Sequence, residues 1–257
     1  MGMALILYPI RLDKVIKPGD DLIEYILEKL NESDISIDNG DILALSIKAV
    51  STSLNLIINI NSITPSNKAL EYSRRYNIDP RIAELVIRES DYIIGGVNGL
   101  LSTIKNGILI GNAGVDRKNA GLNKVVVWPK HPDRVACEIR DRIFRETNKK
   151  IGVILVDSRV TPLRRGTIGV AIGISGFKPI KDYRGVKDIF GYTIRFTWHN
   201  IADDLASAAH LLMGESNELI PAVYIKGAPV ELCDECDSKL LKVDTDECIF
   251  LRNILRT

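Results

Sequence analysis

The segment DSRVTPLRRGTIGVAIG, residues 157–173, places a carboxylate, a hydroxyl and several guanidinium groups next to one another. Asp157 and Ser158 end the apolar run GVILV, and strand ends are where α/β folds present ligand-binding side chains. The guanidinium forks of Arg164 and Arg165 match phosphate and carboxylate oxygens, and the glycines that follow would let backbone amides approach a phosphate. A structural interpretation is also open, because arginine-rich turns are usually solvated and glycines often serve β-bulges.

Two further segments carry possible oxygen ligands after small residues. In GNAGVDRKN, residues 111–119, Asp116 could coordinate a metal ion and Asn119 could form a hydrogen bond with a bound molecule. Alternatively, the two residues form an Asx turn that only caps the next segment. In MGESNE, residues 213–218, Gly214 is the usual residue at a helix end, and Glu215 would leave the helix to point into a site. A third carboxylate is thereby available for a metal.

Carboxylates and arginines in these positions indicate divalent metal and phosphate, but the common signatures of such chemistry are absent. No G-x-x-x-x-G-K-[ST] occurs, which excludes a conventional P-loop, and no H-E-x-x-H or G-x-S-x-G supports zinc hydrolysis or serine esterase chemistry. His131, His199 and His210 stand in separate contexts and are interpreted as surface or helix-face residues rather than catalytic bases. A nucleotide site must therefore be of another kind.

The residues between these segments predict helices and strands in irregular alternation. Apolar residues at helical spacing predict helices over residues 19–33, 66–76, 80–90, 132–148 and 201–215. Apolar and β-branched runs predict strands over residues 41–48, 55–60, 107–111, 124–128, 151–157 and 222–227, the first of them ending in Ser46, Ile47 and Lys48. This order predicts a mixed α/β or α+β architecture rather than a barrel.

Composition and charge limit the class of protein. The 257 residues are 46% hydrophobic and 26% charged, so the chain can bury a full hydrophobic core. We expect one catalytic unit over residues 1–257, with a subdomain break near 147–150 and a C-terminal tail at 230–257. The formal net charge of +1 does not predict nucleic acid or an anionic membrane as partner. No apolar run is long enough for a signal peptide or a membrane span, so we expect a cytoplasmic protein.

Four cysteines leave two interpretations open. Cys233 and Cys236 form CDEC, with Cys248 beyond them and Cys137 far away, which offers half a zinc site or a local disulfide. A structural zinc site would need a second close pair, so the sequence favours a disulfide or inert thiols.

Five segments together resemble one family over nearly the whole chain. The segments GDILALSIKAVS, IRESD, NGILIGNAGVDRKN, GVILVDSRVTPLRRGTIGVAIGISGFKPIKDYRGVKDIFGYTIRFT and IADDLASAAHLLMGE resemble, in this order, the coenzyme F420 gamma-glutamyl ligase family. The NAG-hydrophobic-D, RRGxxGVAIG and DYRGxKDxFG blocks are long and occur at family spacing. The resemblance implies a GTP-dependent ligase that joins L-glutamate to the lactyl carboxylate of F420-0, the glutamate-free deazaflavin coenzyme.

The resemblance also implies a fold and partners. It implies an intertwined α+β homodimer with mixed sheets, distinct from P-loop and ATP-grasp folds. Two Mg²⁺ or Mn²⁺ ions and K⁺ would act with GTP. The partners would be the small-molecule substrates F420-0, L-glutamate and GTP, with neither nucleic acid nor a membrane among them.

Carried over residue by residue, the resemblance assigns a metal site and a nucleotide site. Asp116 and Asp157 match ligands of one metal, while Ser158 and Glu215 match ligands of the second. The residues assigned to the nucleotide site are Asp13, Lys14, Val15, Ile16, Ser46, Ile47, Lys48, Asn119, Met213, Gly214, Ser216 and Asn217. Arg164 and Arg165 are the candidate catalytic residues, because they would hold phosphate or the acidic substrate.

Two departures from the family leave the acceptor open. After the segment SIKAVS the family commonly shows Lys and then Ala-Glu-Gly, whereas this chain reads TSLN from Thr52, which leaves Lys48 as the candidate replacement. Where many members read G-R-P-W-R, this chain reads RVTPLRR at residues 159–165. One alternative is therefore a paralogue that ligates an amino acid to a different carboxylate. Another is a dimer that binds nucleotide or deazaflavin without turnover, against which the four retained metal-site residues argue.

Overall fold

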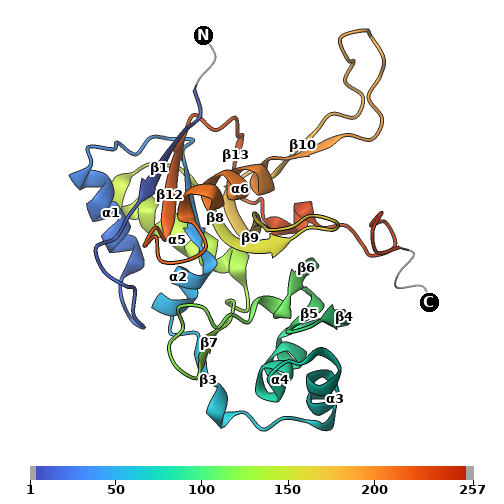
Figure 1. Cartoon of the computed structure of the whole chain (residues 1–257). Helices are drawn as coiled ribbons and strands as arrows, with labels where there is room; N and C mark the ends of the chain where they lie inside the picture. The colour runs from blue at the N-terminus through green and yellow to red at the C-terminus, as the bar shows by residue number, and fades with distance from the viewer. Residues whose placement is uncertain (1–3, 253–257) are drawn as a thin grey trace.

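The computed structural model describes residues 4–252, and a six-stranded sheet forms its centre (Figure 1). In sheet order the strands are β1 (Ile6–Ile10), β12 (Ala222–Lys226), β2 (Ile42–Ser46), β8 (Gly152–Val160), β9 (Thr167–Phe177) and β13 (Leu232–Cys233). The strands β2 and β8 are parallel, with Ser46 beside Val156, and the other neighbours are antiparallel. Because parallel strands end at the same edge of a sheet, the residues that follow Ser46 and Val156 are brought together.

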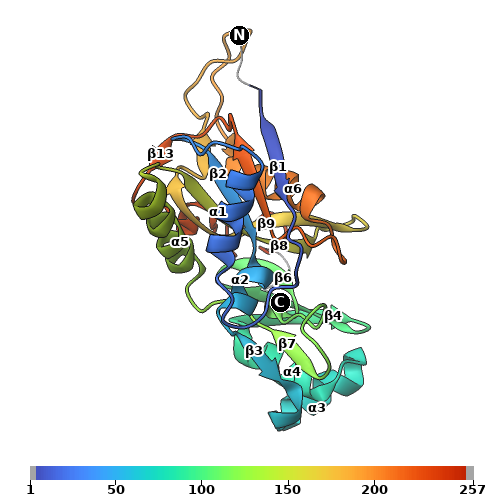
Figure 2. The same cartoon turned by 90° about the vertical axis from the view of Figure 1, so that its left-hand side faces the viewer.

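Helices cover both faces of this sheet (Figure 2). Leu45 of β2 packs in one core with α1 (Leu22–Glu32) and α5 (Pro132–Thr147), whereas its neighbour Ala44 packs in the other core with α6 (Ile201–Met213). Successive side chains of a strand point to opposite faces, so a strand covered on both faces is apolar throughout. This arrangement explains the continuous apolar runs of β2 and β8.

A smaller unit, residues 56–127, has its own core below the main sheet (Figures 1 and 2). Leu85, Leu101 and Val125 are buried in that core. The elements of the unit are β3 (Ile57–Asn59), the 3-10 turn η1 (Ile60–Ser62), α3 (Asn67–Tyr76), α4 (Pro80–Glu89), β4 (Tyr92–Val97), β5 (Leu100–Lys105), β6 (Ile108–Gly111), the 3-10 turn η2 (Asn112–Gly114) and β7 (Lys124–Val126). The unit carries Asp116 and Asn119, so it supplies one side of the candidate site.

Two segments extend beyond the central strands in the C-terminal half of the chain. The strand β10 (Ile180–Asp182) pairs with β11 (Trp198–Asn200), and the loop between them projects as an arm (Figure 1). The tail after β12 contains β13, the 3-10 turn η3 (Ser238–Leu241) and a disulfide between Cys233 and Cys236. The remaining two cysteines are free thiols, so the interpretation as a disulfide or inert thiols is confirmed.

The structure confirms the mixed α+β architecture and corrects one predicted element. The five predicted helices correspond to α1, α3, α4, α5 and α6, and each predicted apolar run contains a strand. The strand predicted through Lys48 was too long: it ends at Ser46, and Ile47–Ser53 form the helix α2. Ile47, Val50 and Ser51 are buried at helical spacing, so packing overrides the strand preference of β-branched residues. The strands β1, β4, β5, β10, β11 and β13 were not predicted, and β9 was only one of two interpretations of the glycine-rich segment.

Two glycines of the opening segment lie in β9 and allow helices to pack closely. A β-carbon on Gly169 would collide with the backbone of Ala206 in α6, and one on Gly173 would collide with Pro132 at the start of α5. The pairing of β8 with β9 shifts register between Leu155 and Val156, which marks a bulge beside Gly173. The interpretation as a β segment with a bulge is therefore confirmed beside Gly173, whereas Gly169 is regularly paired and allows close helix packing instead.

Within residues 4–252, every helix is too short or too polar to cross a membrane.

Candidate functional site

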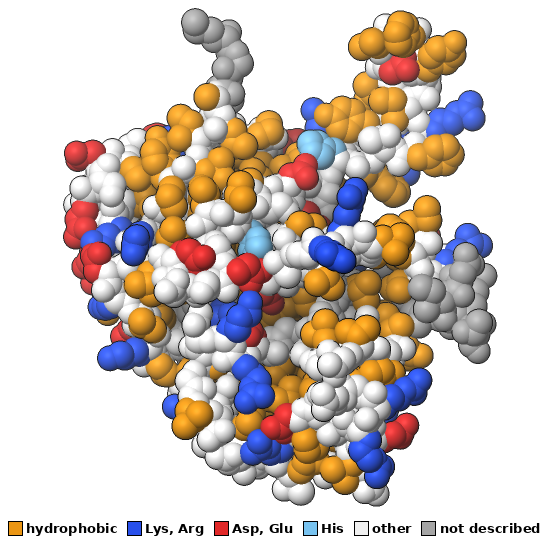
Figure 3. Space-filling view, viewed as in Figure 1, with side chains coloured by type: hydrophobic (Ala, Val, Ile, Leu, Met, Phe, Trp, Pro, Cys, Tyr) orange, Lys and Arg blue, Asp and Glu red, His pale blue; other side chains and the backbone are white. Residues whose placement is uncertain are grey.

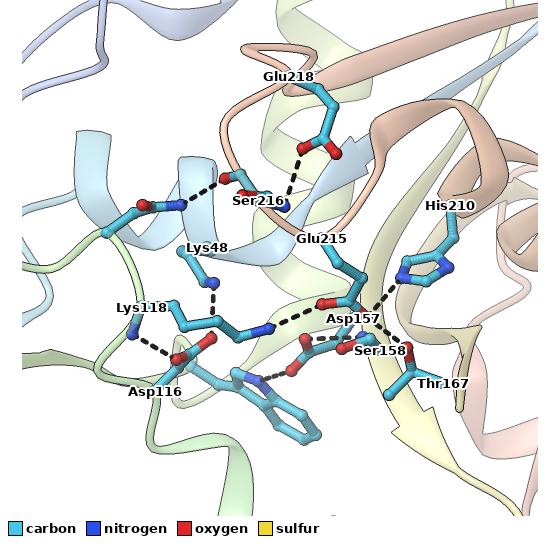
Figure 4. Close-up of polar contacts among 12 residues, drawn as sticks. Lys48, Asp116, Lys118, Asp157, Ser158, Thr167, His210, Glu215, Ser216 and Glu218 are labelled. Atoms are coloured by element: carbon cyan, nitrogen blue, oxygen red, sulfur yellow. Dashed lines mark hydrogen bonds and ion pairs between the residues drawn. The ribbon is translucent and has the colours of Figure 1, made fainter. Parts of the chain in front are cut away.

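A pocket of about 340 Å³ lies at the edge where β2 and β8 end, beside α2 and the loop that follows α6. Figure 4 shows the polar side chains that meet there. The predicted site residues that line the pocket are Lys14, Val15, Ile16, Ser46, Lys48, Asn119, Asp157, Ser158, Met213, Gly214, Glu215, Ser216 and Asn217. The fold thus brings together segments that are far apart in the sequence.

Asp157 lies on β8 where the strand reaches the pocket. One carboxylate oxygen accepts a hydrogen bond from the indole Nε1 of Trp128 at 2.7 Å, and the other accepts one from the backbone N–H of Ser158 at 2.8 Å. Burial raises the pKa of Asp157 to about 6, and the negative charge of Asp116 acts in the same direction. Two carboxylates therefore share a poorly solvated region, which a divalent cation would stabilise.

Asp116 reaches the pocket from the smaller unit, where its backbone pairs with that of Val126. Its Oδ1 accepts a hydrogen bond from the N–H of Lys118 at 2.7 Å, and its Oδ2 lies 2.6 Å from Nζ of Lys48 (Figure 4). The first contact is the Asx turn that the sequence left open as an alternative. The turn does not use the second oxygen, which faces the lysine of α2.

Glu215 directly follows the glycine cap of α6 and stands at the centre of a polar cluster (Figure 4). Its carboxylate accepts hydrogen bonds from Nζ of Lys118 at 2.8 Å and from the hydroxyl of Thr167, and it lies 3.1 Å from Nε2 of His210. Burial opposes ionisation of this carboxylate, but the contacts with Lys118, Thr167 and the side chain of Ser158 outweigh it and lower the pKa of Glu215 to about 2. Glu215 is therefore ionised at neutral pH.

The donor set of this site fits a hard divalent cation. Carboxylate and hydroxyl oxygens are the protein ligands that Mg²⁺ and Mn²⁺ prefer. These donors are the side chains of Asp116, Asp157, Ser158 and Glu215. Among residues 4–252 no three His, Cys, Asp or Glu side chains already form a metal-binding cluster, and Lys48 and Lys118 contact two of the carboxylates instead.

The loop after α6 forms one wall of the pocket and contacts the smaller unit. The carbonyl of Ser216 accepts a hydrogen bond from Nδ2 of Asn119 at 3.0 Å, and the N–H of Ser216 donates to Oε2 of Glu218 at 2.8 Å. On the opposite side, Nζ of Lys14 lies 3.4 Å from the ring centre of Tyr25. These contacts hold both predicted nucleotide-binding segments at the pocket.

Five predicted site residues do not line the pocket. Arg164 and Arg165 are exposed in the turn between β8 and β9, because the two strands continue as a ribbon beyond the pocket edge. Asp13 pairs with Lys29 of α1 at 2.6 Å, and Ile47 is buried in the main core. Asp116 does not line the pocket either, but it forms an ion pair with Lys48, which does.

Several functional neighbours were missed by sequence reasoning. Lys118, Thr167 and His210 contact Glu215, and Trp128 contacts Asp157. The interpretation of His210 as a helix-face residue is correct in secondary structure, but this face of α6 is turned toward the pocket. Its spacing of five residues before Glu215, across a helix cap, was the available signal. No local signal marks the other three, since long-range folding creates their contacts.

The amino-acid sequence is similar to known proteins over most of its length. The sequence model of the family F420-0:Gamma-glutamyl ligase matches residues 10–227. The coenzyme F420:L-glutamate ligase of Methanopyrus kandleri is 37% identical over 225 residues, which cover 87% of each chain. A protein of the same name from Methanococcus maripaludis strain S2 is 37% identical over 220 residues, which cover 85% of this chain and 88% of that protein. Another of the same name, from Archaeoglobus fulgidus, is 35% identical over 228 residues, which cover 89% of this chain and 90% of that protein.

These similarities, together with an α+β fold that gathers carboxylates at one pocket, define an enzyme of the ligase class. The chain belongs to the F420-0:gamma-glutamyl ligase family. The family match ends at residue 227, so the disulfide and most of the C-terminal tail lie outside it.

Proposed function

We propose that this enzyme uses GTP and two divalent metal ions to join L-glutamate to the terminal carboxylate of F420-0. The names of the relatives support the substrate pair. The structural observation that carries the proposal is the convergence of Asp116, Asp157 and Glu215, from three distant segments, around one pocket that the loop at residues 213–220 also lines. Acidic oxygen donors beside lysines suit a nucleoside triphosphate with its metal ions.

The oxygen donors of the pocket would hold the metal ions. Asp116 and Asp157 are the proposed ligands of one ion, and Ser158 and Glu215, which already contact each other, are the proposed ligands of the second. When bound, the ions neutralise the charge crowded between triphosphate and acceptor carboxylate. Lys48, on the first turn of α2, lies in the same cluster and would bind phosphate oxygens, which makes it the replacement for the lysine missing after residue 51.

The proposed reaction creates a leaving group on the acceptor carboxylate. A carboxylate oxygen of F420-0 attacks the γ-phosphorus of GTP, the bond to the β-phosphate oxygen breaks, and GDP leaves. The unprotonated amine of L-glutamate then attacks the acyl carbon of the resulting acyl phosphate, so that the amide bond forms and inorganic phosphate leaves. No covalent intermediate with the enzyme is required. Arg164 and Arg165, on the exposed turn, would bind a phosphate or an acidic substrate that extends beyond the pocket.

A turnover assay tests this proposal directly. The full chain is incubated with F420-0, L-glutamate, GTP and Mg²⁺ or Mn²⁺, with and without KCl, and both glutamylated product and released phosphate are measured. We expect one phosphate per amide bond. Metal-dependent GTP binding without product would instead favour a paralogue with another acceptor, to which the RVTPLRR turn at residues 159–165 points. Absence of both binding and product would overturn the nucleotide site.

The arm between β10 and β11 supports the proposed homodimer. Ile189, Phe190 and Phe196 are 93%, 80% and 88% exposed, and Figure 3 shows hydrophobic side chains gathered along this projection. Exposed apolar patches of this kind mark interaction surfaces. A second copy of the chain is the proposed partner, because the family resemblance implies an intertwined dimer.

A further inference from the structure

A second cavity, of about 300 Å³, lies between the β8–β9 ribbon, the β5–β6 hairpin and the C-terminal tail. Ser158 lines the first pocket and the next residue, Arg159, lines the second. Along β8 the residues up to Ser158 line the first pocket and those from Arg159 onward line the second, and the two cavities have no lining residue in common. Ile108 of the hairpin and Val170 of the ribbon contribute apolar wall.

The tail forms a fixed wall of this second cavity. Leu241 and Phe250 line it, and both follow residue 227, where the family match ends. Asp133, at the start of α5, accepts hydrogen bonds from the N–H of Ser238 at 3.1 Å and from its hydroxyl at 2.7 Å. This anchor, together with the disulfide at residues 233 and 236, holds the tail against the body of the protein.

Arg159 is only partly engaged by protein groups. Its Nη2 lies 3.9 Å from Oδ2 of Asp203, which is too far for a hydrogen bond, and its buried Nε has no partner among residues 4–252. The carboxylate of Asp203 already accepts hydrogen bonds from the N–H of Ala171 at 2.9 Å and from Nδ2 of Asn200 at 2.8 Å. The side chain is 31% exposed and no hydrogen bond among residues 4–252 involves it, so the outer Nη nitrogens of the guanidinium retain donors for a ligand.

A second cation lies on the same cavity. Lys242 lines the wall with its stem against the hairpin, where a β-carbon on Gly107 would stand 3.1 Å from Cδ of the lysine. The salt bridges within residues 4–252 do not include Lys242. The cavity therefore has two cationic side chains against one carboxylate that is already hydrogen-bonded, on walls that are largely apolar.

We propose that this cavity binds a small amphipathic carboxylate, with an aromatic or aliphatic body against the apolar walls and its carboxylate on Arg159. The guanidinium fork donates to both oxygens of such a head group, and Lys242 adds positive charge at the wall. The inference goes beyond the proposed ligase reaction, because the site shares no lining residue with the first pocket and is closed by a tail outside the family match.

Calorimetric titration of the full chain with two matched probes tests the inference. Naphthalene-2-carboxylate and naphthalene-2-carboxamide share an apolar body and differ in charge. We expect one carboxylate per chain, bound at least about tenfold more tightly than the carboxamide, and we expect Arg159→Gln to remove this preference. Arg134→Gln, which alters an exposed arginine of α5 outside the cavity, is the matched control and should keep it.

Further measurements locate the bound probe. Phe250→Ser should weaken both probes and preserve the preference for the carboxylate, and saturating GTP with Mg²⁺ should leave the affinities unchanged. Equal affinity of the two probes, absence of binding, a preference that survives Arg159→Gln, or displacement by GTP would each overturn the inference. Because none of these measurements requires turnover, failure of the ligase proposal leaves this test intact.

Discussion

At the scale of single residues, Asp157 is the position at which removal of one charge tests the proposed metal site. Asp157→Asn retains one oxygen that can accept the hydrogen bond from the Trp128 indole, but it loses the bond from the N–H of Ser158 and the negative charge proposed to bind metal. We expect turnover in the proposed reaction to fall by about 10²-fold or more, with the fold preserved. Steady-state rates and thermal unfolding measure the two effects separately.

The matched control for this substitution is Asp34→Asn. Asp34 is exposed and has a φ of 53°, a left-handed conformation that asparagine tolerates well. This variant should retain wild-type rates. If Asp157→Asn were equally active, Asp157 could not be a metal ligand.

The sequence identified the acidic residues of the site because each has a local mark. Asp157 ends an apolar run, Asp116 follows a glycine turn, and Glu215 follows a helix-ending glycine. Lys118 and Trp128 have no such mark, because their contacts with Glu215 and Asp157 join distant parts of the chain. Their roles become visible only after folding.

At the scale of elements, α1 depends on Asp21, which caps it and links it to α5. The side chain accepts a hydrogen bond from the N–H of Glu24 at 3.0 Å and another from the guanidinium of Arg142. The bond from Arg142, reinforced by that from Glu24, lowers the pKa of Asp21 below its ordinary value near 3.8. Ionised Asp21 thus stabilises the fold above pH 3.8, and this contribution is lost as the pH falls through the lowered pKa.

Two substitutions separate the cap from the ion pair. Asp21→Asn keeps a capping oxygen and loses only the charge, so we expect a deficit in unfolding free energy below about 1 kcal/mol at pH 7 that is smaller at pH 3. Asp21→Ala should cost about 1 kcal/mol more, since it also removes the cap. Urea unfolding at both pH values measures these differences, and a deficit of Asp21→Asn that does not change with pH would contradict the assignment.

The contact of β9 with α6 depends on the absence of a side chain at Gly169. Gly169→Ala would drive a methyl group into the backbone of Ala206, so we expect a loss of about 1–3 kcal/mol in unfolding free energy. Gly95→Ala in β4 is the control, because the nearest atom, the hydroxyl of Tyr76, would be 3.8 Å away. Denaturant midpoints should show a clear loss for the first variant only. Equal losses would show that helix packing is not the reason for Gly169.

Sequence patterns predicted elements well where burial on one face dominates, as in α1 and α4, and poorly where strands are short or packing is decisive. The first two residues of α2 were read as strand because Ile47 continues an apolar, β-branched run, although Ile47 and Val50 are buried at helical spacing. The exposed β10 and β11 have no apolar core face to reveal them.

At the scale of the whole molecule, the apolar arm predicts self-association. The double variant Ile189→Ser, Phe190→Ser removes two of its most exposed apolar side chains, and we expect a dimer to become a monomer in size-exclusion chromatography with light scattering. Leu122→Ser changes an equally exposed residue outside the arm and should leave the mass unchanged. A wild-type monomer, or a double variant that stays dimeric, would contradict the proposal.

The sequence predicted the fold class but not the order of strands in the sheet. Strand β12 lies between β1 and β2 in the sheet although β2 ends at Ser46 and β12 begins only at Ala222, and no local pattern specifies such a pairing. The same limit applies to the division of the chain: the break near residues 147–150 stays a prediction, although α5 ends at Thr147 and β8 begins at Gly152.

The candidate site joins two separate cores, and this has a thermodynamic consequence. Asp116 and Asn119 belong to the smaller unit, whereas Asp157 and Glu215 belong to the main body. A nucleotide with its metal ions that contacts both sets would act as a non-covalent cross-link, adding about 2.7 kcal/mol of stability at a ligand concentration one hundred times its Kd. Amide hydrogens of residues 56–127 should then exchange more slowly with GTP and Mg²⁺ present, so that the smaller unit reports on occupancy of a pocket it only partly forms.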